Sequence, residues 1–465
     1  MNKRWSIILL LLMPMSMAFA TSIARGPYLS NVTTSGITVA FEVNLFSCSG
    51  GVKYATNSYW SAYGAFTNTI NSPSSATHHT FMLSGLLPWT DYAYRVFTNS
   101  DSSEVHFFRT APIGTVPFSF IAYGDPRTNQ PEHRTVAQQA WSHRTQFVLN
   151  SGDLVTDGNT WLGALEWTEF FNSISNLAGD AAYYPAVGNH EDEVDGYFRP
   201  QFELPNNEQW YSFDYSNCHF VILNNCADFS PGSAQYNFVE ADLTAAAGNY
   251  DFIFVCFHCP PYTCGTEHGN DTNSQTYLCP LFEANGVSIV FNGHNHGYER
   301  NFVNGIYYIV TGGGGATLYG VSPQSYTIYA ESVYHYCLIT INGDSLHFEA
   351  KYDDGTTFDS FDLTSPLYAE DTQNFIKGFS LNAYPNPFNS SCAIEIPNSE
   401  FLITNVEIFD LNGKSVGRLV APITHNRPPI TEFVWRPAPF ISSGVYLVRV
   451  IYNGKTMTKR IAYLK

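Results

Sequence analysis

The stretch FNGHNHGYER, residues 291–300, governs the interpretation of this sequence. It continues the apolar run VSIVFN, which predicts a buried strand. His294 and His296 follow a glycine and are one residue apart, so on an extended backbone both imidazoles point to the same side. An isolated His-x-His pair is more often a polar turn with two surface histidines than a metal site. Whether these two residues bind metal therefore depends on the rest of the chain.

Four other apolar runs of the central region also end in polar clusters. They are FSFIAYGD (118–125), QFVLNSGD (146–153), YYPAVGNH (183–190) and FIFVCFH (252–258). Stretches with helical spacing, such as PEHRTVAQQAWSH and FVEADLTAAA, alternate with these runs. The alternation predicts a layered α/β domain over residues 113–362. Because active sites of α/β sheets lie at the carboxyl ends of strands, we expect the polar clusters to share one rim.

The clusters together supply two carboxylates, one amide oxygen and three imidazoles. The candidate ligands are Asp125, Asp153, Asn189, His258, His294 and His296. Taken singly, a Gly-Asp pair is usually a turn and an asparagine is often a helix cap. Taken together, this mixture of oxygen and nitrogen donors suits two divalent or trivalent metal ions a few ångströms apart. The sequence therefore predicts a bimetallic site.

The regions on either side of the central domain read as all-β. Residues 21–112 contain short alternating runs such as ITVAFEV and YAYRVFT, which predict an N-terminal β-sandwich. A polar linker is expected at residues 363–377. Residues 378–465 contain alternating runs and an Asn-Gly turn, which predict a C-terminal β-sandwich with hairpins. This multidomain organisation agrees with a length of 465 residues, which suggests about three domains.

The first twenty residues have the pattern of a secretory signal peptide. Lys3 and Arg4 form a basic start, an apolar centre follows, and Ala18-Phe19-Ala20 gives a cleavage site. No later segment is apolar enough to span a bilayer, so the mature protein is expected to be exported without a transmembrane segment. The formal net charge of −18 disfavours nucleic acid as a general partner.

Nine cysteines are present, and an exported chain can oxidise them. Cys264 and Cys279 lie in a polar loop region, where a disulfide between them is one option. Three others lie in apolar runs and are expected to be buried thiols: Cys218, Cys256 and Cys337. Cys259 follows the candidate ligand His258. A zinc-thiolate role for it is disfavoured, because the other candidate ligands are oxygen and imidazole groups.

The ordered series Gly-Asp, Gly-Asp, Gly-Asn-His-Glu, His and Gly-His-x-His, followed by Tyr-Glu-Arg and a glycine run, resembles the calcineurin-like metallophosphoesterase superfamily. Within it, the purple acid phosphatase branch is the most similar. GPYLSNVTTSGITVAFEV and LSGLLPWTDYAYRV likewise resemble the fibronectin type III-like domain that precedes the catalytic domain of that branch. The resemblance implies a four-layer αββα sandwich for the central domain.

The resemblance also implies how the ligands divide between the two metal ions. In that family the second aspartate, here Asp153, bridges both ions. The other ligands form two sets: Asp125 and His296 for the first ion, and Asn189, His258 and His294 for the second. Two adjacent cations would neutralise a bound phosphate and lower the pKa of a water. The expected activity is hydrolysis of small phosphomonoesters by a metal-bound hydroxide, as in acid phosphatases.

Two further histidines acquire roles from the same resemblance. His190 follows a ligand and is expected to bind substrate or protonate the leaving group, a task that imidazole suits near neutral pH. His268 matches a second substrate-facing histidine, with a solvated loop position as the alternative. The run from Gly312 to Gly315 is expected to allow close backbone approach near the metals, in preference to cradling phosphate.

The sequence departs from the family pattern at two positions. Thr156 stands where purple acid phosphatases carry a tyrosinate ligand, so an Fe(III)-tyrosinate centre is not expected and the ions are Fe, Zn or Mn. Arg127 stands where other members of the superfamily place a histidine ligand. Arg127 is interpreted as a clamp on a phosphate oxygen, and the alternative is an ion pair with Glu132 or another acid.

The C-terminal block resembles the sorting domain of the type IX secretion system. The similarity lies in YPNPFN (384–389), VEIFDLNG (406–413) and SGVY (443–446). It implies transport by the type IX machinery, through the periplasm, to the outer surface or surroundings of a Gram-negative bacterium. A carbohydrate-binding sandwich is the alternative, which has less support because Trp435 is the only tryptophan of the block.

Two other functions stay open at this point. A phosphodiesterase or nucleotidase would use the same ligands, since distal contacts decide between mono- and diesters. A surface binding protein with a decayed site would need no metal chemistry. It is disfavoured because every ligand position carries a usable group.

Overall fold

The computed structural model describes residues 21–44, 46–158, 163–191, 198–365, 382–397, 405–410, 414–420, 430–452 and 455–465. The expected signal peptide, residues 1–20, and most of the expected linker at 363–377 lie outside these ranges. The chain forms two compact units, Met1–Leu367 and Tyr368–Lys465, which are described separately.

Nine strands form the larger sheet of the first unit, in the order β20-β19-β18-β8-β9-β10-β1-β2-β5. In chain order they are β1 (Ile23–Ser30), β2 (Gly36–Val43), β5 (His78–Ser84), β8 (Phe118–Tyr123), β9 (Phe147–Asn150), β10 (Ala182–Pro185), β18 (His335–Asn342), β19 (Ser345–Tyr352) and β20 (Thr357–Thr364). The central strands β8, β9, β10 and β1 pair in parallel, and antiparallel strands complete the sheet on both sides. The sheet is therefore mixed.

A second sheet of seven strands has the order β11-β12-β13-β14-β16-β15-β17. Its strands are β11 (Tyr211–Tyr215), β12 (Cys218–Ile222), β13 (Phe252–Cys256), β14 (Ile289–Asn292), β15 (Tyr298–Val303), β16 (Ile306–Thr311) and β17 (Thr327–Glu331). The neighbours β12, β13, β14 and β16 pair in parallel. Strands buried on both faces need continuous apolar runs, which is why FIFVC and IVFN carry no polar residue before their last positions.

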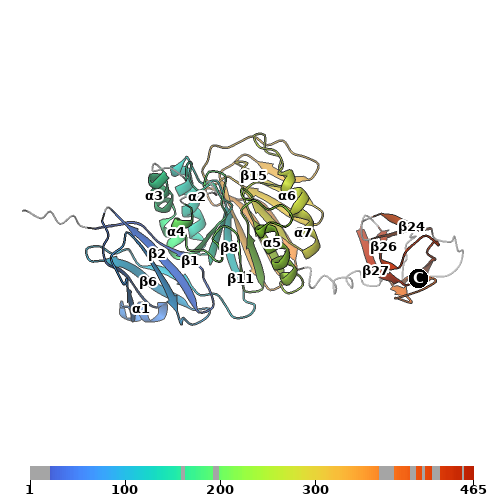
Figure 1. Cartoon of the computed structure of the whole chain (residues 1–465), viewed down its shortest axis with the longest axis horizontal. Coiled ribbons are helices and arrows are strands. Elements are labelled where there is room, and N and C mark those ends of the chain that lie inside the picture. The colour runs from blue at the N-terminus through green and yellow to red at the C-terminus, as the bar shows by residue number, and fades with distance from the viewer. Residues whose placement is uncertain are drawn as a thin grey trace, which may run out of the picture. The chain divides into compact units, whose positions relative to one another are not determined.

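Aromatic side chains join the two sheets face to face. The ring of Phe120 in β8 lies 5.3 Å from the rings of both Phe220 and Phe254 in the other sheet. Helices cover the outer faces, as Figure 1 shows: one group on the nine-stranded sheet and another on the seven-stranded sheet. The first group is α2 (Gln130–Ser142), α3 (Gly163–Ser173) and α4 (Ser175–Asp180); the second is α5 (Ala234–Ala246), α6 (Thr272–Tyr277) and α7 (Cys279–Asn285).

The N-terminal strands are part of the same nine-stranded sheet. Strand β1 pairs in parallel with β10 at Leu29 and Ala182, and β2 and β5 extend the sheet beyond it. A separate four-stranded sheet, β4-β3-β6-β7, completes this region. Its strands are β3 (Gly50–Thr56), β4 (Asn68–Asn71), β6 (Asp91–Thr98) and β7 (His106–Arg109), with the short helix α1 (Asn57–Tyr63) after β3.

The second unit is all-β within its described residues. It contains a three-stranded sheet, β21-β22-β25, and a four-stranded sheet, β24-β23-β26-β27. The strands are β21 (Asn382–Tyr384), β22 (Cys392–Pro397), β23 (Asn405–Phe409), β24 (Ser415–Val420), β25 (Ile430–Trp435), β26 (Gly444–Tyr452) and β27 (Lys455–Tyr463). Phe388, Trp435 and Tyr446 lie in its own hydrophobic core. The expectation of a mixed α/β region flanked by β-rich regions is confirmed.

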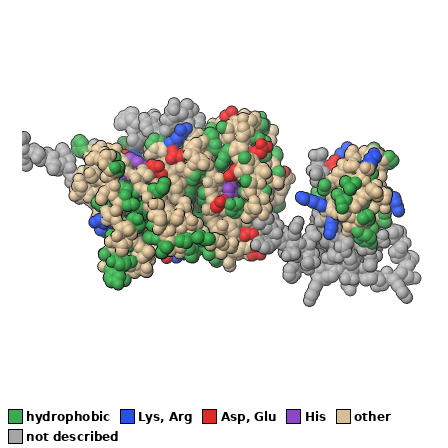
Figure 2. Space-filling view, turned by 60° about the horizontal axis from the view of Figure 1, so that its bottom comes forward, with side chains coloured by type: hydrophobic (Ala, Val, Ile, Leu, Met, Phe, Trp, Pro, Cys, Tyr) green, Lys and Arg blue, Asp and Glu red, His purple; other side chains and the backbone are tan. Residues whose placement is uncertain are grey.

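Charge differs between the two units. The second unit has 10 basic and 7 acidic residues, which leaves 12 basic and 33 acidic residues, a net −21, in the first unit. Figure 2 shows acidic side chains spread over the first unit and basic side chains projecting from the second. No helix within the described ranges is long and apolar enough to cross a membrane.

The cysteines lie in the described part of the chain, and none of the nine forms a disulfide there. Cys218, Cys256 and Cys337 are buried, which confirms that expectation. The disulfide between Cys264 and Cys279, which the sequence left open, is not formed. Cys264 is bonded through its backbone N–H to Glu299, while Cys279 begins helix α7.

Candidate metal centre

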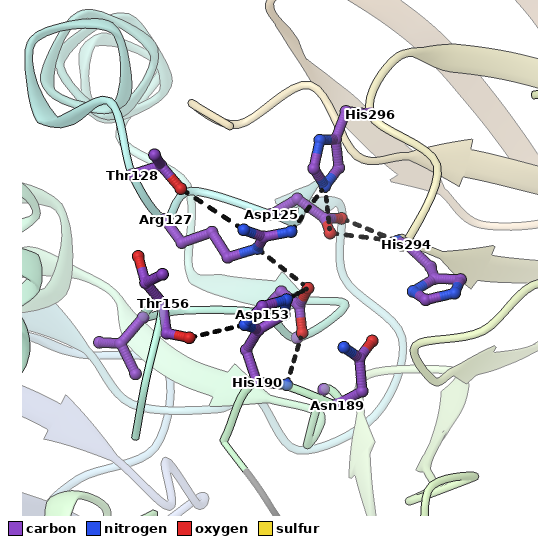
Figure 3. A network of polar contacts seen from close by, with 12 residues as sticks. Asp125, Arg127, Thr128, Asp153, Thr156, Asn189, His190, His294 and His296 are labelled. Carbon is purple, nitrogen blue, oxygen red and sulfur yellow. Dashed lines mark hydrogen bonds and ion pairs between the residues drawn. The ribbon is translucent and has the colours of Figure 1, made fainter. Parts of the chain in front are cut away.

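Five strand ends converge on one cluster of polar side chains. Asp125, Asp153 and Asn189 follow β8, β9 and β10 of one sheet, and His258 and the histidine pair follow β13 and β14 of the other. All six predicted ligands are brought together, and Figure 3 shows those on both sides of Asp153. The arrangement follows from the topology, because the parallel strands of both sheets end at the same rim.

The first part of the cluster surrounds His258, which is fully buried. Its Nδ1–H donates to the backbone carbonyl of Ser151 at 2.8 Å, which leaves the lone pair of Nε2 facing the cluster. Nε2 lies 3.1 Å from Asn189 Oδ1, 3.2 Å from His294 Nδ1 and 3.2 Å from Asp153 Oδ1. These four nitrogen and oxygen atoms can all present lone pairs to one point, which suits them to hold a cation.

The electrostatics of the protein alone point the same way. Burial lowers the pKa of His258, but the carboxylates of Asp153 and Asp125 outweigh this effect and raise it well above its usual value. A proton can thus serve as the cation when no metal is bound, and a metal ion would replace that proton. Burial, assisted by His258, lowers the pKa of His294 to about 3, so His294 is a neutral imidazole suited to metal ligation.

The second part of the cluster contains Asp125, Asp153 and His296, all buried, whose ligand atoms lie within 4.8 Å of one another. His296 donates from Nδ1 to the carbonyl of Thr317 at 2.7 Å, so its Nε2 also faces inward with a lone pair. Burial raises the pKa of Asp153, but neighbouring His258, His190 and Arg127 lower it below its ordinary value overall. Asp153 is therefore a carboxylate, and it touches both parts of the cluster.

Three of the ligands are held in an unusual backbone conformation. Asp125, Asp153 and His294 have φ angles of 55°, 56° and 68°, in the left-handed region that non-glycine residues rarely adopt. Such strain persists only where the surroundings enforce it, and it clusters at functional sites. For His294, the backbone N–H donates to the Asp125 carboxylate at 3.0 Å, which links the two strand ends.

Glu191, the last residue of Gly-Asn-His-Glu, is a supporting residue that sequence reasoning missed. Its buried carboxylate accepts backbone N–H groups from both sides of the site: Asp153 (2.9 Å), Leu154 (2.6 Å), Val155 (3.2 Å) and Gly188 (2.8 Å). Burial, followed by the nearby Asp153 carboxylate, raises the pKa of Glu191 above its ordinary value. An acidic residue two positions after the candidate ligand Asn189 is the signal that identifies it.

Arg127 lies inside the cluster. Its Nε donates to Asp153 Oδ2 at 3.1 Å and its Nη2 lies 3.4 Å from His296 Nε2 (Figure 3). Of the two alternatives for this residue, the structure contains the ion pair, and the partner is Asp153 instead of Glu132. Contact with a phosphate remains a prediction.

His190 is held at the edge of the cluster by the residue that replaces the family's tyrosine. Its Nδ1–H donates to the backbone carbonyl of Thr156 at 2.6 Å, and its backbone N–H donates to Asp153 Oδ1 at 3.1 Å. The Nε2 atom is 3.9 Å from Asp153 Oδ2. The imidazole is partly exposed, so it lies at the solvent-facing edge of the cluster.

Asn295, which lies between His294 and His296, holds His268 next to the cluster. The Asn295 side chain accepts from His268 N at 3.2 Å and donates to His268 O at 3.0 Å. The imidazole of His268 stacks on that of His294, with 3.8 Å between ring centroids. Burial, followed by the nearby histidines, lowers the pKa of His268. Tyr319 similarly stacks on His296 at 4.0 Å, a contact that sequence reasoning missed.

The glycine run after β16 provides close backbone approach, as expected. A Cβ on Gly312 would lie 2.3 Å from the carbonyl oxygen of Asn295, and one on Gly314 would lie 2.3 Å from that of Gly124. Cys259 Sγ forms a further possible ligand group with His258 and His294. The thiolate role that the ligand chemistry disfavours is thus within geometric reach.

Comparisons with known proteins identify the class to which this site belongs. Residues 118–298 match the calcineurin-like phosphoesterase family, and residues 382–463 match the secretion system C-terminal sorting domain. The chain thus contains a calcineurin-like metallophosphoesterase domain, a family that implies dinuclear metal binding, and a type IX sorting domain. The latter indicates secretion to the outer surface of a Gram-negative bacterium.

The relatives place the chain near the purple acid phosphatases, as the sequence motifs predicted. Purple acid phosphatase 18 of Arabidopsis thaliana is 27% identical over 248 residues, covering 49% of this chain and 53% of that protein. Probable inactive purple acid phosphatase 1 of the same plant is 24% identical over 386 residues, covering 68% of this chain and 62% of that protein. The chain spans about half the length of the first curated relatives it matches.

A solved structure shares the fold. Purple acid phosphatase PPD1 from yellow lupin (Lupinus luteus) seeds superposes with a TM-score of 0.63 at 20% identity, covering 74% of each chain. At this identity the likeness concerns the fold alone. The activity of the chain must be argued from its own site.

Proposed function

We propose that the chain is an exported, metal-dependent phosphoesterase that hydrolyses small phosphomonoesters, in the manner of an acid phosphatase. The observation that carries the proposal is the acceptor cluster around His258 Nε2, where an imidazole, an amide oxygen and a carboxylate lie within 3.2 Å of one lone pair. Buried acceptors without a cation between them are costly, so this cluster is suited to hold a metal ion.

The family resemblance implies how the residues would hold metal ions. Asp125 and His296 would hold a first ion, Asn189, His258 and His294 would hold a second, and Asp153 would be shared between them. When bound, divalent cations supply charge neutralisation for the phosphate and acidify water. The metal ions are proposed to be Fe, Zn or Mn without a tyrosinate ligand, because Thr156 replaces the tyrosine and has no phenolic oxygen.

Two histidines would handle the substrate. With Nδ1 bonded to Thr156, His190 has only Nε2 left to carry a proton toward the leaving oxygen. His268, fixed by Asn295 and stacked on His294, would close the other side and orient the ester.

The proposal also covers the export route and the domain boundaries of the chain. Cleavage of residues 1–20 would deliver the chain to the periplasm, and the type IX machinery would move it to the surface. The mature part would comprise a fibronectin type III-like domain (21–112), a four-layer αββα phosphoesterase domain (113–362), a linker (363–377) and the sorting domain (378–465). No nucleic acid is proposed as a general partner.

Phosphate release tests the proposal. The purified mature protein, loaded in turn with Mn, Zn and Fe, is expected to hydrolyse p-nitrophenyl phosphate faster than bis-p-nitrophenyl phosphate. An Asp153→Asn variant should lose at least a hundredfold in kcat/KM, because one bridging charge is removed. Faster cleavage of the diester would favour a phosphodiesterase. No turnover with any of the three metals would sink the proposal and favour a binding protein with a decayed site.

A further inference from the structure

Arg127 lies where the first metal ion would bind. The guanidinium donates from Nε to Asp153 Oδ2 at 3.1 Å, and Nη2 lies 3.4 Å from His296 Nε2. The side chain is only 14% exposed, and Figure 3 shows it extending between Asp153 and His296. Its position is therefore set by the cluster and not by solvent.

The atoms that Arg127 contacts are those through which a metal ion would be bound. Because His296 donates from Nδ1 to Thr317 O, its Nε2 can only accept. Nε2 also lies 3.5 Å from Asp125 Oδ1. A metal ion would sit roughly 2.0–2.2 Å from each of these ligands. That leaves no room for a guanidinium bonded to the same lone pairs.

The other ligand group is different. The lone pair of His258 Nε2 faces Asn189, His294 and Asp153, each at 3.1–3.2 Å, and all of these atoms are acceptors. No arginine or lysine side chain among the hydrogen bonds and ion pairs of the described residues reaches these atoms. The group of Asp125, Asp153 and His296 is occupied by a guanidinium, whereas here a metal ion need only take the place of a proton on His258.

The group that Arg127 contacts is also short of ligands. It offers Asp125, Asp153 and His296. The family pattern adds a tyrosine or a histidine, but those positions carry Thr156 and Arg127 here. Thr156 is exposed and directs its carbonyl to His190. A permanent guanidinium cation faces three candidate ligands, and no fourth His, Cys, Asp or Glu joins their group within the described residues. This arrangement disfavours a metal ion there.

We propose that Arg127 takes the place of the first metal ion, so that the chain binds one ion tightly, at the Asn189, His258 and His294 group. A second ion enters only by displacing the guanidinium. This inference rests on the proposed metal-dependent function. It gives the phosphate two cations of different kinds, one metallic and one part of the chain, and Arg127 keeps its expected contact with a phosphate oxygen.

Metal content tests the inference independently of catalysis. The mature full chain is loaded with excess Zn, desalted, and measured by elemental analysis. The wild-type protein is expected to retain one zinc ion per chain. The Arg127→His variant is expected to retain two, because the substitution supplies a ligand and removes the competing cation. Anomalous scattering should place the additional ion between Asp125 and His296. Arg134→His, a change of the same kind on the exposed face of α2, should leave the ratio at one.

Each outcome has a separate meaning. Two zinc ions retained by wild type, or one by a folded Arg127→His variant, would overturn the inference while leaving the phosphoesterase proposal intact. A change from one to two without phosphate release in any form would support the inference and reject the proposed activity. Circular dichroism of each variant, compared with wild type, establishes that the ratio refers to folded protein.

Discussion

Replacement of Glu191 by glutamine tests whether this carboxylate holds the metal-binding loops in place. Oε1 accepts the N–H groups of Leu154 and Val155, and Oε2 accepts those of Asp153 and Gly188. Glutamine keeps one oxygen and turns the other into an NH₂ group, which cannot accept. Whichever way the amide is oriented, two buried backbone donors lose their partner.

The expected cost follows from these contacts. A buried donor without an acceptor costs about 1–3 kcal/mol, so two cost about 2–6 kcal/mol. The substitution also removes a buried negative charge, and the raised pKa of Glu191 shows that this charge is unfavourable in its surroundings. The gain offsets part of the loss. We therefore expect a net destabilisation of about 2–4 kcal/mol.

Calorimetry with a matched control measures this effect. Glu191→Gln should lower the melting temperature of the first unit by on the order of 5 °C. Glu166 provides the control, because its carboxylate also accepts two backbone N–H groups, from Thr156 and Asp157, but at the solvent-exposed surface. Glu166→Gln should shift the melting temperature by less than about 2 °C, since both donors bond the single oxygen Oε2, which an amide oxygen can replace, and water is available there. Equal shifts for the two variants would refute the argument from burial.

Further perturbations probe other parts of the first unit. His219 forms hydrogen bonds with both Asp214 and Asp242. These bonds outweigh the effect of burial and raise the pKa of His219 to about 9. Its contribution to the free energy of unfolding is therefore complete below pH 6.5, near the pKa of an unfolded histidine, and is lost as the pH rises through 9. His219→Gln should thus cost about 2 kcal/mol at pH 6 and little at pH 10 in urea unfolding; a cost independent of pH would reject the ion-pair explanation. Asn295→Ala should reduce kcat/KM about tenfold at unchanged metal content, by releasing His268; unchanged kinetics would remove His268 from the proposed site. Chelation should lower the melting temperature by several degrees, because it removes a ligand that binds only the native state; an identical melting curve would argue against a bound ion.

The convergence of the six candidate ligands could be predicted from the sequence because it is a property of the backbone. An apolar run followed by Gly-Asp or Gly-His marks the end of a buried strand, and parallel strands end together. Asp125, Asp153 and His258 therefore had to approach one another once the sheets formed. The buried aromatic residues between the sheets, such as Phe120, made the sheets themselves predictable.

The position of Arg127 could not be predicted in the same way. An arginine side chain has many rotamers, and the one adopted depends on which partners the finished site leaves with free lone pairs. Asp153 Oδ2 and His296 Nε2 are such partners only because other contacts fix the carboxylate and the imidazole tautomer. The same holds for Asn295, whose clamp on His268 joins residues 27 positions apart in a loop without a periodic pattern.

The N-terminal strands show how a domain that looks independent in sequence can support a site it does not contain. Without β1, strand β10 would be an exposed edge of the large sheet, and β10 leads directly into Asn189, His190 and Glu191. The contact is also stabilised outside the sheet, since Tyr28 of β1 stacks on Phe171 of α3 with ring centroids 4.5 Å apart. Alternating runs reveal that β1 is a strand but not which strand it pairs with. The N-terminal region therefore contributes to the candidate metal centre through the stability of β10, although it contains none of the six candidate ligands.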